Sequence, residues 1–297
     1  MILLHLMGGL GNQMSQVAFS YTVARETNNT VMVDTTSYKH YKRRPCSIGK
    51  LKLTSIMELD TQKSLYFYRC RILQKMYHLL NRIFYNGKET GEGVFRFFES
   101  FNHLYSFDSK YYELKLQKGN LDIYGYFLIE PYYRKYYTEI CEMFDIKPEF
   151  MSDKANKYQE QINNSRTPIA LSLRLQDDYA KDKTMNVCTI DYYLRGIKKL
   201  QEMFTDATFF VFADDIEKAK KLDLIQDAVY ISGMSDVEGM QLMKQCKHFL
   251  ISNSSFSWWG AYLSNKKDKV IIAPDHWINN NKDYSAKYYE NMIKIQS

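Results

Sequence analysis

The residues of this sequence best suited to binding or catalysis are one arginine and one hydroxyl-rich segment, each placed directly after an apolar run. Arg174 follows residues 168–173, and Ser254, Ser255, Phe256 and Ser257 follow residues 249–252 at the start of a helical pattern. An arginine fork pairs with anionic oxygens, and the free amides of a helix N-terminus attract the same groups. These residues therefore predict a site for an anionic ligand.

The aspartates nearby occur as adjacent pairs, Asp177 with Asp178 and Asp214 with Asp215. Neighbouring residues of a strand point to opposite faces, so such a pair chelates a cation poorly. We therefore expect no metal and no other cofactor. Asp214 and Asp215 follow an apolar run, and two interpretations stay open for them. One is recognition of a base or ribose by a carboxylate, and the other is a turn or helix cap.

A glycine-rich loop lies between an apolar run at residues 2–6 and a helical pattern at 14–25. Gly9, Gly11 and Asn12 are its candidate ligand contacts, because glycine lets a ligand approach the backbone closely. The loop lacks the third glycine of GxGxxG and the GK[ST] of a P-loop, which argues against a standard dinucleotide fold and a phosphoryl-transfer enzyme. A left-handed turn before a helix is the alternative interpretation.

Alternating strand and helix patterns predict two parallel α/β halves. The first half opens with a strand–helix–strand unit, continues through mostly helical residues 50–120 and includes a strand at 121–127 and a helix at 130–144. Residues 147–166 are the expected connection. In the second half we expect strands at 168–173, 207–213, 228–231, 249–252 and 270–273, with helices at 191–203, 237–246, 256–264 and 283–295. A ligand is expected at the carboxyl ends of the strands.

Composition sets the class of protein. The chain has 297 residues, 45% hydrophobic, with a formal net charge of +6. No run approaches the ~20 apolar residues of a membrane span, and the N-terminus lacks the pattern of a signal peptide. The five scattered cysteines fit a reducing cytoplasm. This mild charge, with no recognised motif, argues against nucleic-acid binding.

Part of the excess positive charge lies in residues 63–82, whose sequence has a basic amphipathic pattern. We interpret it as a surface helix with a solvated basic face, and peripheral contact with an anionic membrane is the alternative.

Several segments in order resemble the bacterial α-1,2-fucosyltransferase family, glycosyltransferase family 11. The opening GGLGNQMSQVAF is similar to the family's GGLGNQMFQYAF, and residues 208–216 are similar to its FFVFSDDI strand. The most specific match is NSSFSWWGA at residues 253–261. One motif differs: where the family carries HxRRGD, only Arg174 and Asp177 match, and Ser172, Leu175 and Gln176 replace the histidine, the second arginine and the glycine.

The resemblance implies a GT-B-like α/β fold with two Rossmann-like domains facing across a cleft. We expect residues 1–150 to form the acceptor domain and residues 165–297 the domain that binds the GDP-sugar, with the last helix packed back on the first domain. Arg174 and the SxFS turn are then expected to hold the diphosphate.

The implied activity is inverting transfer of L-fucose from GDP-fucose to the 2-hydroxyl of a galactoside in a surface glycan, and a lipid-linked glycan is one form the acceptor can take. Asp177 is the candidate base for the acceptor hydroxyl, and a salt bridge to Arg174 is its alternative role. The departures at Ser172, Leu175 and Gln176 leave two rivals: the same fold with another nucleotide-sugar donor, and a non-catalytic relative that binds glycan or nucleotide.

Overall fold

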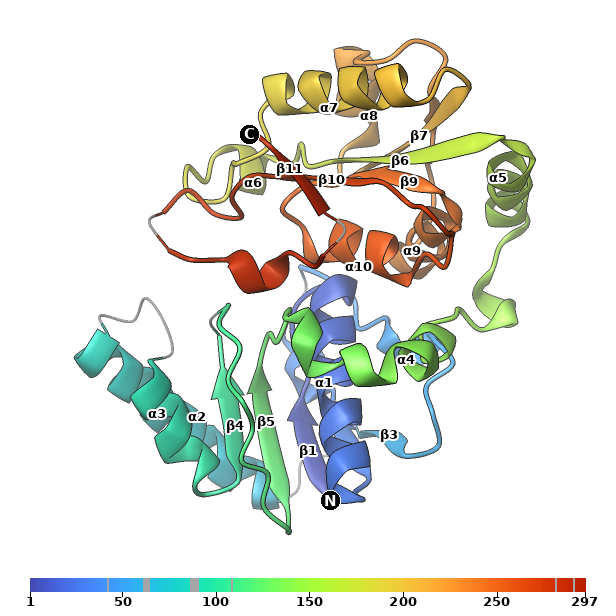
Figure 1. Ribbon diagram of the computed structural model, residues 1–297. Coiled ribbons are helices and arrows are strands. Elements are labelled where there is room, and N and C mark those ends of the chain that lie inside the picture. Colours follow the sequence, from blue (N-terminus) through green and yellow to red (C-terminus); the bar gives the residue numbers. More distant parts are fainter. Residues whose placement is uncertain (42, 61–64, 86–90, 108, 281, 291) are drawn as a thin grey trace. The chain divides into compact units, whose positions relative to one another are not determined.

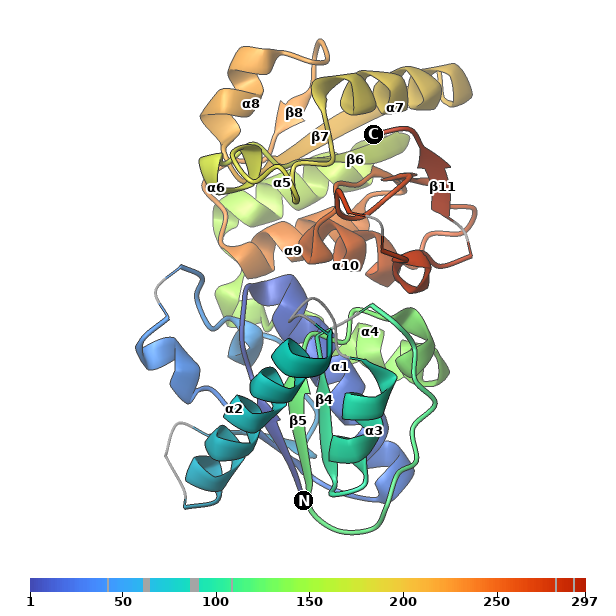
Figure 2. The same cartoon turned by 90° about the vertical axis from the view of Figure 1, so that its left-hand side faces the viewer.

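The protein consists of two compact α/β units (Figures 1 and 2). The computed structural model describes residues 1–41, 43–60, 65–85, 91–107, 109–280, 282–290 and 292–297, without the side chains of residues 60, 65–69, 177 and 178. Unit 1 comprises Met1–Phe144 with Ser285–Lys287, and unit 2 comprises Asp145–Tyr284 with Tyr288–Ser297. The acceptor and donor roles given to the two halves stay predictions.

Unit 1 is built on a parallel sheet in the order β3-β2-β1-β5-β4. Its strands are β1 (Ile2–His5), β2 (Val31–Asp34), β3 (Met57–Asp60), β4 (His103–Ser106) and β5 (Leu121–Gly125). Its helices are α1 (Leu10–Thr27), α2 (Leu65–Tyr85), α3 (Glu92–Glu99) and α4 (Tyr137–Met143), with short 3-10 helices at Thr36–Lys39, Ile48–Lys50, Glu130–Tyr132 and Arg134–Tyr136.

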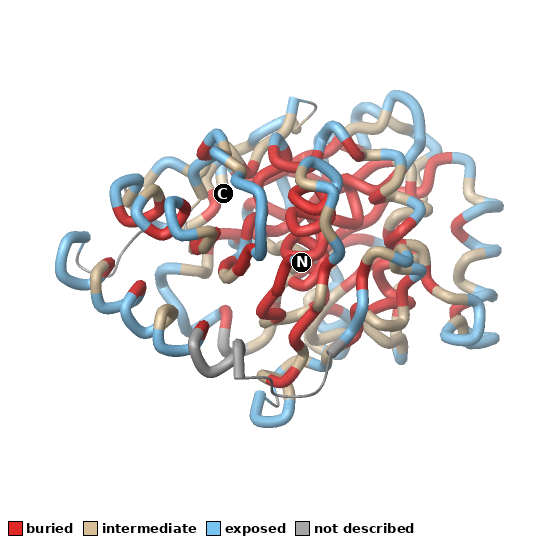
Figure 3. The backbone as a smooth tube through the Cα atoms, turned by 90° about the horizontal axis from the view of Figure 1, so that it is seen from below, coloured by how far each residue is buried: buried red, intermediate tan, exposed pale blue. Residues whose placement is uncertain are grey.

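Helix α1 is buried along most of its length, and so is β1 (Figure 3). The two glycines before α1 let the chain turn directly from the end of β1 into this helix, and Gly8 adopts the left-handed backbone region at φ 80°. Because a buried helix cannot shift without opening the core, the loop before it has a rigid base.

Unit 2 contains a parallel sheet in the order β11-β10-β9-β6-β7-β8. The strands are β6 (Thr167–Leu173), β7 (Ala207–Ala213), β8 (Val229–Tyr230), β9 (His248–Leu250), β10 (Ile271–Pro274) and β11 (Met292–Ile295). The helices are α5 (Asp153–Asn164), α6 (Asp177–Ala180), α7 (Ile190–Met203), α8 (Ile216–Leu222), α9 (Asp236–Gln245) and α10 (Ser255–Leu263), with a 3-10 helix at Pro148–Phe150.

Alternate residues of β6 serve two separate cores. Ile169, Leu171 and Leu173 pack with residues of α7 and α8 on one face of the sheet, whereas Ala170 packs with residues of α5, α9 and α10 on the other. Figures 1 and 2 show these helices on opposite sides of the sheet. A central strand with both faces covered is continuously apolar, as the sequence pattern indicated.

Most of the predicted elements are confirmed within a few residues, and the fold class is confirmed as α/β with two parallel sheets. The prediction of mostly helix over residues 50–120 was wrong in two places, because β3 and β4 lie there. Each of these strands has only four residues, two of them polar, so neither an apolar run nor a period-2 pattern shows against the helical surroundings. Residues 130–144 form two 3-10 turns followed by α4, not one helix.

The predicted helix at 283–295 was also wrong. Its residues form a 3-10 helix at Ser285–Lys287 and strand β11, and residue 291 lies outside the described part of the chain. β11 pairs in parallel with β10, from Ile271 opposite Met292 to Pro274 opposite Ile295. β-branched Ile293 and Ile295 suit a strand, and pairing satisfies the backbone groups that β10 would otherwise leave open.

The basic amphipathic pattern predicted at 63–82 corresponds to α2, although residues 63 and 64 lie outside the described residues. Among the helices that the structure describes, none combines the length and apolar character needed to cross a bilayer.

His248, at the start of β9, makes the stability of unit 2 sensitive to acid. Its ring is buried and stacks on Phe204, with centroids 3.9 Å apart, and its Nδ1 accepts a hydrogen bond from the Val270 amide at 3.0 Å. Burial, with a smaller effect of Lys247, lowers the pKa of His248 to about 4. In the unfolded chain the same ring titrates near its ordinary value of about 6.5.

The unfolded state therefore takes up a proton before the folded state does as the pH falls. The stability associated with neutral His248 is present above pH ~6.5 and is lost progressively towards pH ~4. We expect the urea midpoint to fall more between pH 7 and pH 5 for the wild type than for His248→Gln, whose amide does not titrate. His40→Gln, at an exposed histidine, should keep the wild-type difference; equal slopes for all three proteins would contradict this account.

Candidate functional site

Three of the predicted site segments lie at the same edge of the sheet in unit 2. Arg174 follows β6, Asp214 follows β7, and Ser254 lies shortly after β9. In the sheet, β6 lies between β7 and β9. The chain continues from β6 to β7 on one side, whereas it continues from β9 to β10 on the other side, so the strand order reverses between β6 and β9. In open parallel sheets, ligands bind beside the carboxyl ends of the strands at such a switch point. The topology thus brings together the residues that are predicted to bind a diphosphate.

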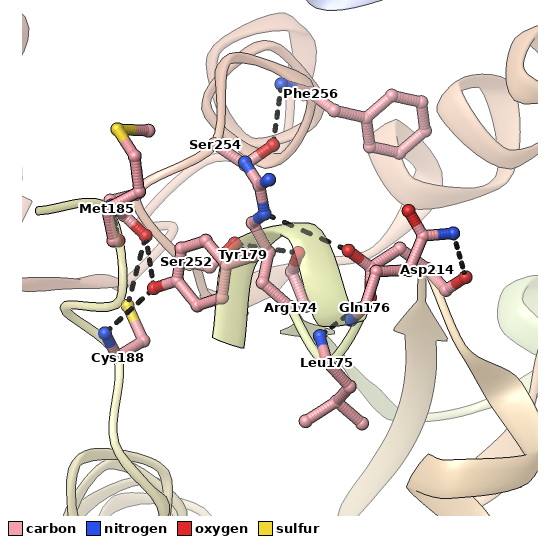
Figure 4. Close-up of polar contacts among 12 residues, drawn as sticks. Arg174, Leu175, Gln176, Tyr179, Met185, Cys188, Asp214, Ser252, Ser254 and Phe256 are labelled. Carbon is pink, nitrogen blue, oxygen red and sulfur yellow. Dashed lines mark hydrogen bonds and ion pairs between the residues drawn. The ribbon is translucent and has the colours of Figure 1, made fainter. Parts of the chain in front are cut away.

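Arg174 is half-buried and held on two sides. Its Nε lies 3.8 Å from Oδ2 of Asp214, and its guanidinium carbon lies 4.5 Å from the centre of the Tyr179 ring. Among the described residues, its Nη1 and Nη2 make no hydrogen bond. Figure 4 shows the side chain extending from the end of β6 in the direction of Ser254. A positioned arginine with unused donors suits an anionic ligand.

Asp214 fixes the turn that carries Arg174. Its Oδ1 accepts hydrogen bonds from the amides of Leu175, at 2.7 Å, and Gln176, at 3.1 Å, and the Gln176 side chain donates back to the Asp214 carbonyl at 2.9 Å (Figure 4). Asp215 caps α8, because its side chain accepts from the Lys218 amide at 3.0 Å. Asp214 thus stabilises a turn and Asp215 caps a helix, which is one of the two interpretations that the sequence left open for this pair. Recognition of a base or ribose by these carboxylates stays a prediction.

The hydroxyl-rich segment divides into accessible and internal groups. Ser254 caps α10, accepting from the Phe256 amide at 3.2 Å, and Ser254, Ser255 and Phe256 are all half-buried. Ser257 is fully buried, and its hydroxyl lies 3.2 Å from the carbonyls of both Ser252 and Ser254. Ligand contact therefore suits Ser254, Ser255 and Phe256, whereas Ser257 holds the backbone of the turn.

The two tryptophans of this segment are core residues. Trp258 and Trp259 are both fully buried, with ring centroids 5.1 Å apart in an edge-to-face arrangement. At least one was expected to be core, and the structure adds the second.

Asn253 is a site residue that sequence reasoning missed. Its buried side chain accepts from the Tyr179 hydroxyl at 2.7 Å and donates to the carbonyls of Met185 and Trp277, each at 2.9 Å. The Tyr179 hydroxyl in turn accepts from the Cys188 amide at 2.9 Å. Asn253 thus fixes the ring on which Arg174 stacks. Its position at the head of the NSSFSWWGA segment was the available signal.

Asp177 begins α6, four residues long, and its side chain lies outside the described part of the structure. Its role as base therefore stays a prediction, as does the salt bridge to Arg174.

The predicted glycine loop of unit 1 leads into the N-terminus of α1, which has no side-chain cap. Gly9 is the N-cap residue of α1, and Gly11 is buried within its first turn. The Asn12 side chain is half-buried and makes no hydrogen bond among the described residues. A Cβ at Gly8 would lie 2.8 Å from Nδ2 of Asn12, closer than such atoms come. An uncapped helix end next to an unused amide can accept a polar ligand.

Gln13 is a second residue that sequence reasoning missed. It is fully buried, and its Nε2 donates to the carbonyls of Gly8, at 3.0 Å, and Pro45, at 2.8 Å. Its Oε1 accepts from the amides of Ser47 and Ile48, both at 3.0 Å. One side chain therefore satisfies four backbone groups and ties the glycine loop to residues 45–48.

His5, Cys70 and Asp122 form the group of possible metal ligands found among the described residues. However, His5 Nδ1 lies 3.1 Å from Asp34 and its Nε2 2.8 Å from Asp122. Burial alone would lower the pKa of His5, but the hydrogen bonds to Asp122 and Asp34 raise it well above the ordinary value. A ring that donates from both nitrogens has no lone pair for a metal. We interpret the group as a buried ion cluster.

Comparison with known proteins shows the family of this chain. The sequence model of Glycosyl transferase family 11 matches residues 1–296. The chain belongs to glycosyltransferase family 11. It is 28% identical to an alpha-1,2-colitosyltransferase of Escherichia coli, over 93% of this chain and 92% of that protein. It is 26% identical to the O-antigen biosynthesis glycosyltransferase WbnK of Escherichia coli, over 93% and 95% of the two chains.

The fold also agrees with that of solved fucosyltransferases. The crystal structure of the fucosyltransferase NodZ from Bradyrhizobium matches with a TM-score of 0.57 at 12% identity, over 90% of this chain and 95% of that one. NodZ has been co-crystallised with GDP and soaked with GDP-fucose. This likeness shows a GT-B-like fold for the family 11 chain, and the family shows that it is a glycosyltransferase.

The structure shows the surroundings of each residue that departs from the family's HxRRGD pattern. Leu175, at the second arginine position, is buried in the core beside α7 and α8. Ser172, at the histidine position, is buried with its hydroxyl 3.4 Å from that of Ser252. Gln176 replaces a glycine and uses its side chain to bond Asp214. In this glycosyltransferase, Arg174 is thus the arginine of the motif that remains.

Gln13 and its neighbour Asn12 provide a matched test of the loop. Gln13→Ala leaves four backbone groups without their partner, two of them the amides of the buried residues Ser47 and Ile48, and we expect the free energy of unfolding to fall by about 2–4 kcal/mol. Asn12→Ala should change it by less than ~0.5 kcal/mol, because that side chain makes no hydrogen bond among the described residues. Urea unfolding followed by circular dichroism measures both. Similar losses in the two variants would show that Gln13 has no special role in holding the loop.

Proposed function

We propose that this enzyme transfers L-fucose from GDP-fucose to the 2-hydroxyl of a galactoside, with inversion and without a metal or other cofactor. The observation that carries the proposal is Arg174, held by Asp214 and Tyr179 at the switch point of the sheet next to the N-terminal end of α10. NodZ, whose fold is similar, has been co-crystallised with GDP. The family resemblance and this geometry support the same donor class.

The chemistry requires positive potential where the leaving group forms. The bond between the fucose anomeric carbon and the β-phosphate oxygen breaks, and the acceptor oxygen bonds to that carbon from the opposite face. Negative charge then grows on the GDP diphosphate. Arg174, with Nη1 and Nη2 unused among the described residues, and the amides at the start of α10 can stabilise it. The acceptor proton goes to a base, for which Asp177 is our candidate.

In unit 2, the donor-binding residues under this proposal are Arg174, Ser254, Ser255 and Phe256. For unit 1, we separately propose that the glycine-loop residues Gly9, Gly11 and Asn12 bind the donor. Ser257 supports the turn from inside. Asp214 and Asp215 contribute through the Arg174 turn and the α8 cap, and any direct contact with base or ribose is part of the proposal.

We also propose that the acceptor is a growing surface glycan, as the name of the relative WbnK suggests. Such a glycan carried on a lipid at the inner face of the membrane would place the enzyme in the cytoplasm, in peripheral contact with that membrane.

A different donor is the second candidate, and one observation favours it. The relative at 28% identity is named an alpha-1,2-colitosyltransferase. Colitose is fucose without its 3-hydroxyl, so a site for either sugar differs in whether it binds that group. The departures at Ser172, Leu175 and Gln176 are compatible with either donor.

The first test measures transfer from GDP-fucose to lactose in excess EDTA. We expect the wild type to be active and Arg174→Ala to lose about 100-fold or more in kcat, because the charge on the leaving diphosphate loses its main partner. Arg166→Ala is the matched control, since Arg166 is exposed and directly precedes β6 at its other end. Equal activity of the two variants would remove Arg174 from the mechanism, and dependence on added Mg²⁺ or Mn²⁺ would reject the metal-free reaction.

The second test compares GDP-fucose with GDP-colitose on the same acceptor. A site with a hydrogen-bond partner for the 3-hydroxyl leaves that partner unpaired when the donor lacks it. We expect kcat/KM to favour GDP-fucose at least tenfold. A reversed preference would establish the second candidate, and binding of both donors without turnover would count against catalysis with either.

A further inference from the structure

Helix α2 exposes a row of large apolar side chains that takes no part in the site described above. Ile72, Met76, Leu79 and Ile83 follow one another at intervals of four, three and four residues, which places them on one stripe of the helix. Their exposed fractions are 69%, 37%, 56% and 60%. Single exposed apolar residues are normal, but a continuous stripe of four marks a contact surface.

This stripe is separate from the face by which α2 joins the rest of unit 1. Cys70, Tyr77 and Asn81 of the helix are buried. The Tyr77 ring lies edge-to-face with Phe98 of α3, at 5.4 Å, and with Tyr105 of β4, at 5.5 Å. Figure 3 shows the same alternation, with buried and exposed positions along the helix. The core contacts therefore hold α2 in place while its outer stripe stays accessible.

A second row on the outer side of α2 is basic. Arg71, Lys75 and Arg82 are exposed, and residues 65–85 include no aspartate or glutamate. Lys75 stands three residues after Ile72, and Arg82 stands three after Leu79, so each is the helical neighbour of an apolar residue. The outer face of α2 thus consists of an apolar stripe directly beside a basic one.

We propose that this outer face of α2 binds the surface of an anionic lipid bilayer, with the helix lying in the plane of the interface. The apolar stripe would enter the boundary between head groups and acyl chains. The basic row beside it would meet the lipid phosphates. The inference deepens the proposed function, because a lipid-linked acceptor brings the enzyme to such a surface.

The two stripes favour lipid over other occupants. A nucleic acid offers phosphates for the basic row but nothing to cover four apolar side chains. A second copy of the chain in a two-fold contact would bring basic rows together across a self-complementary patch. An anionic bilayer offers the apolar interior and the negative surface side by side, which is the arrangement that this face complements.

The test is co-sedimentation of the full chain with vesicles of phosphatidylcholine containing 30% phosphatidylglycerol, and with vesicles of phosphatidylcholine alone. We expect binding to the anionic vesicles that weakens as salt rises. The double variant Lys75→Gln/Arg82→Gln should bind about 25-fold more weakly, from roughly fivefold per charge. Ile72→Ser/Ile83→Ser should lose at least about tenfold, because apolar area no longer enters the interface.

Lys198→Gln/Lys199→Gln is the matched control, since it removes two exposed basic residues from α7 of unit 2. This control should bind like the wild type, and all variants should keep the wild-type thermal midpoint and the transfer rate on a soluble acceptor. Failure of the wild type to bind anionic vesicles overturns the proposal, and so does wild-type binding by both α2 variants. A dimer in sedimentation that the Ile72→Ser/Ile83→Ser variant abolishes, without vesicle binding, would assign the face to a second copy. Vesicle binding and sugar transfer are separate readouts, so an inactive enzyme that binds vesicles would contradict only the proposed function.

Discussion

Parallel pairing of β6 with β7 and β9 is the constraint on which the candidate site depends. In a parallel sheet all strands end at the same edge, so the residues that follow these three strands meet there although they are 40 to 80 positions apart in the chain. The two cores on either face of β6 hold that strand, and its pairing with β7 on one side and β9 on the other sets its register. Arg174 therefore leaves the sheet from a position that the whole of unit 2 determines.

Buried and half-buried polar side chains then convert this coarse placement into defined loops. Asp214 satisfies two amides of the turn after β6, Asn253 ties the Tyr179 loop to two distant carbonyls, and Gln13 holds four backbone groups around the glycine loop. Each group left unpaired in such surroundings would cost about 1–3 kcal/mol. The loops around a ligand site have little apolar area of their own, so side-chain to backbone hydrogen bonds replace core packing as the source of their rigidity.

The sequence predicted the two parallel sheets and the strand ends because long apolar runs bounded by glycine and aspartate have few alternatives. It also located Arg174 and the Ser254 segment correctly at one edge. The pattern could not reveal β3 (MELD), β4 (HLYS) or β11 (MIKI), because each of these short strands includes charged or polar residues, whereas the equally short β1 and β10 are mainly apolar runs. The roles of Gln13 and Asn253 were hidden for a related reason. An amide side chain reads as a generic polar residue until the fold shows which distant backbone groups surround it.

The replacement of the second arginine by Leu175 has a consequence for how the site can work. Leu175 points into an apolar core, and its amide is engaged by Asp214, so this position contributes shape and no charge. Under the proposed function, the positive potential for a diphosphate would then come from Arg174 together with the helix end at Ser254. The Asp214 carboxylate partly offsets the charge of Arg174, so the benefit of this contact lies in fixing the position of the Arg174 side chain. A single guanidinium fixed by a carboxylate and an aromatic ring loses less freedom on binding than a flexible one, and under the proposed function that saving in entropy would offset part of the missing charge.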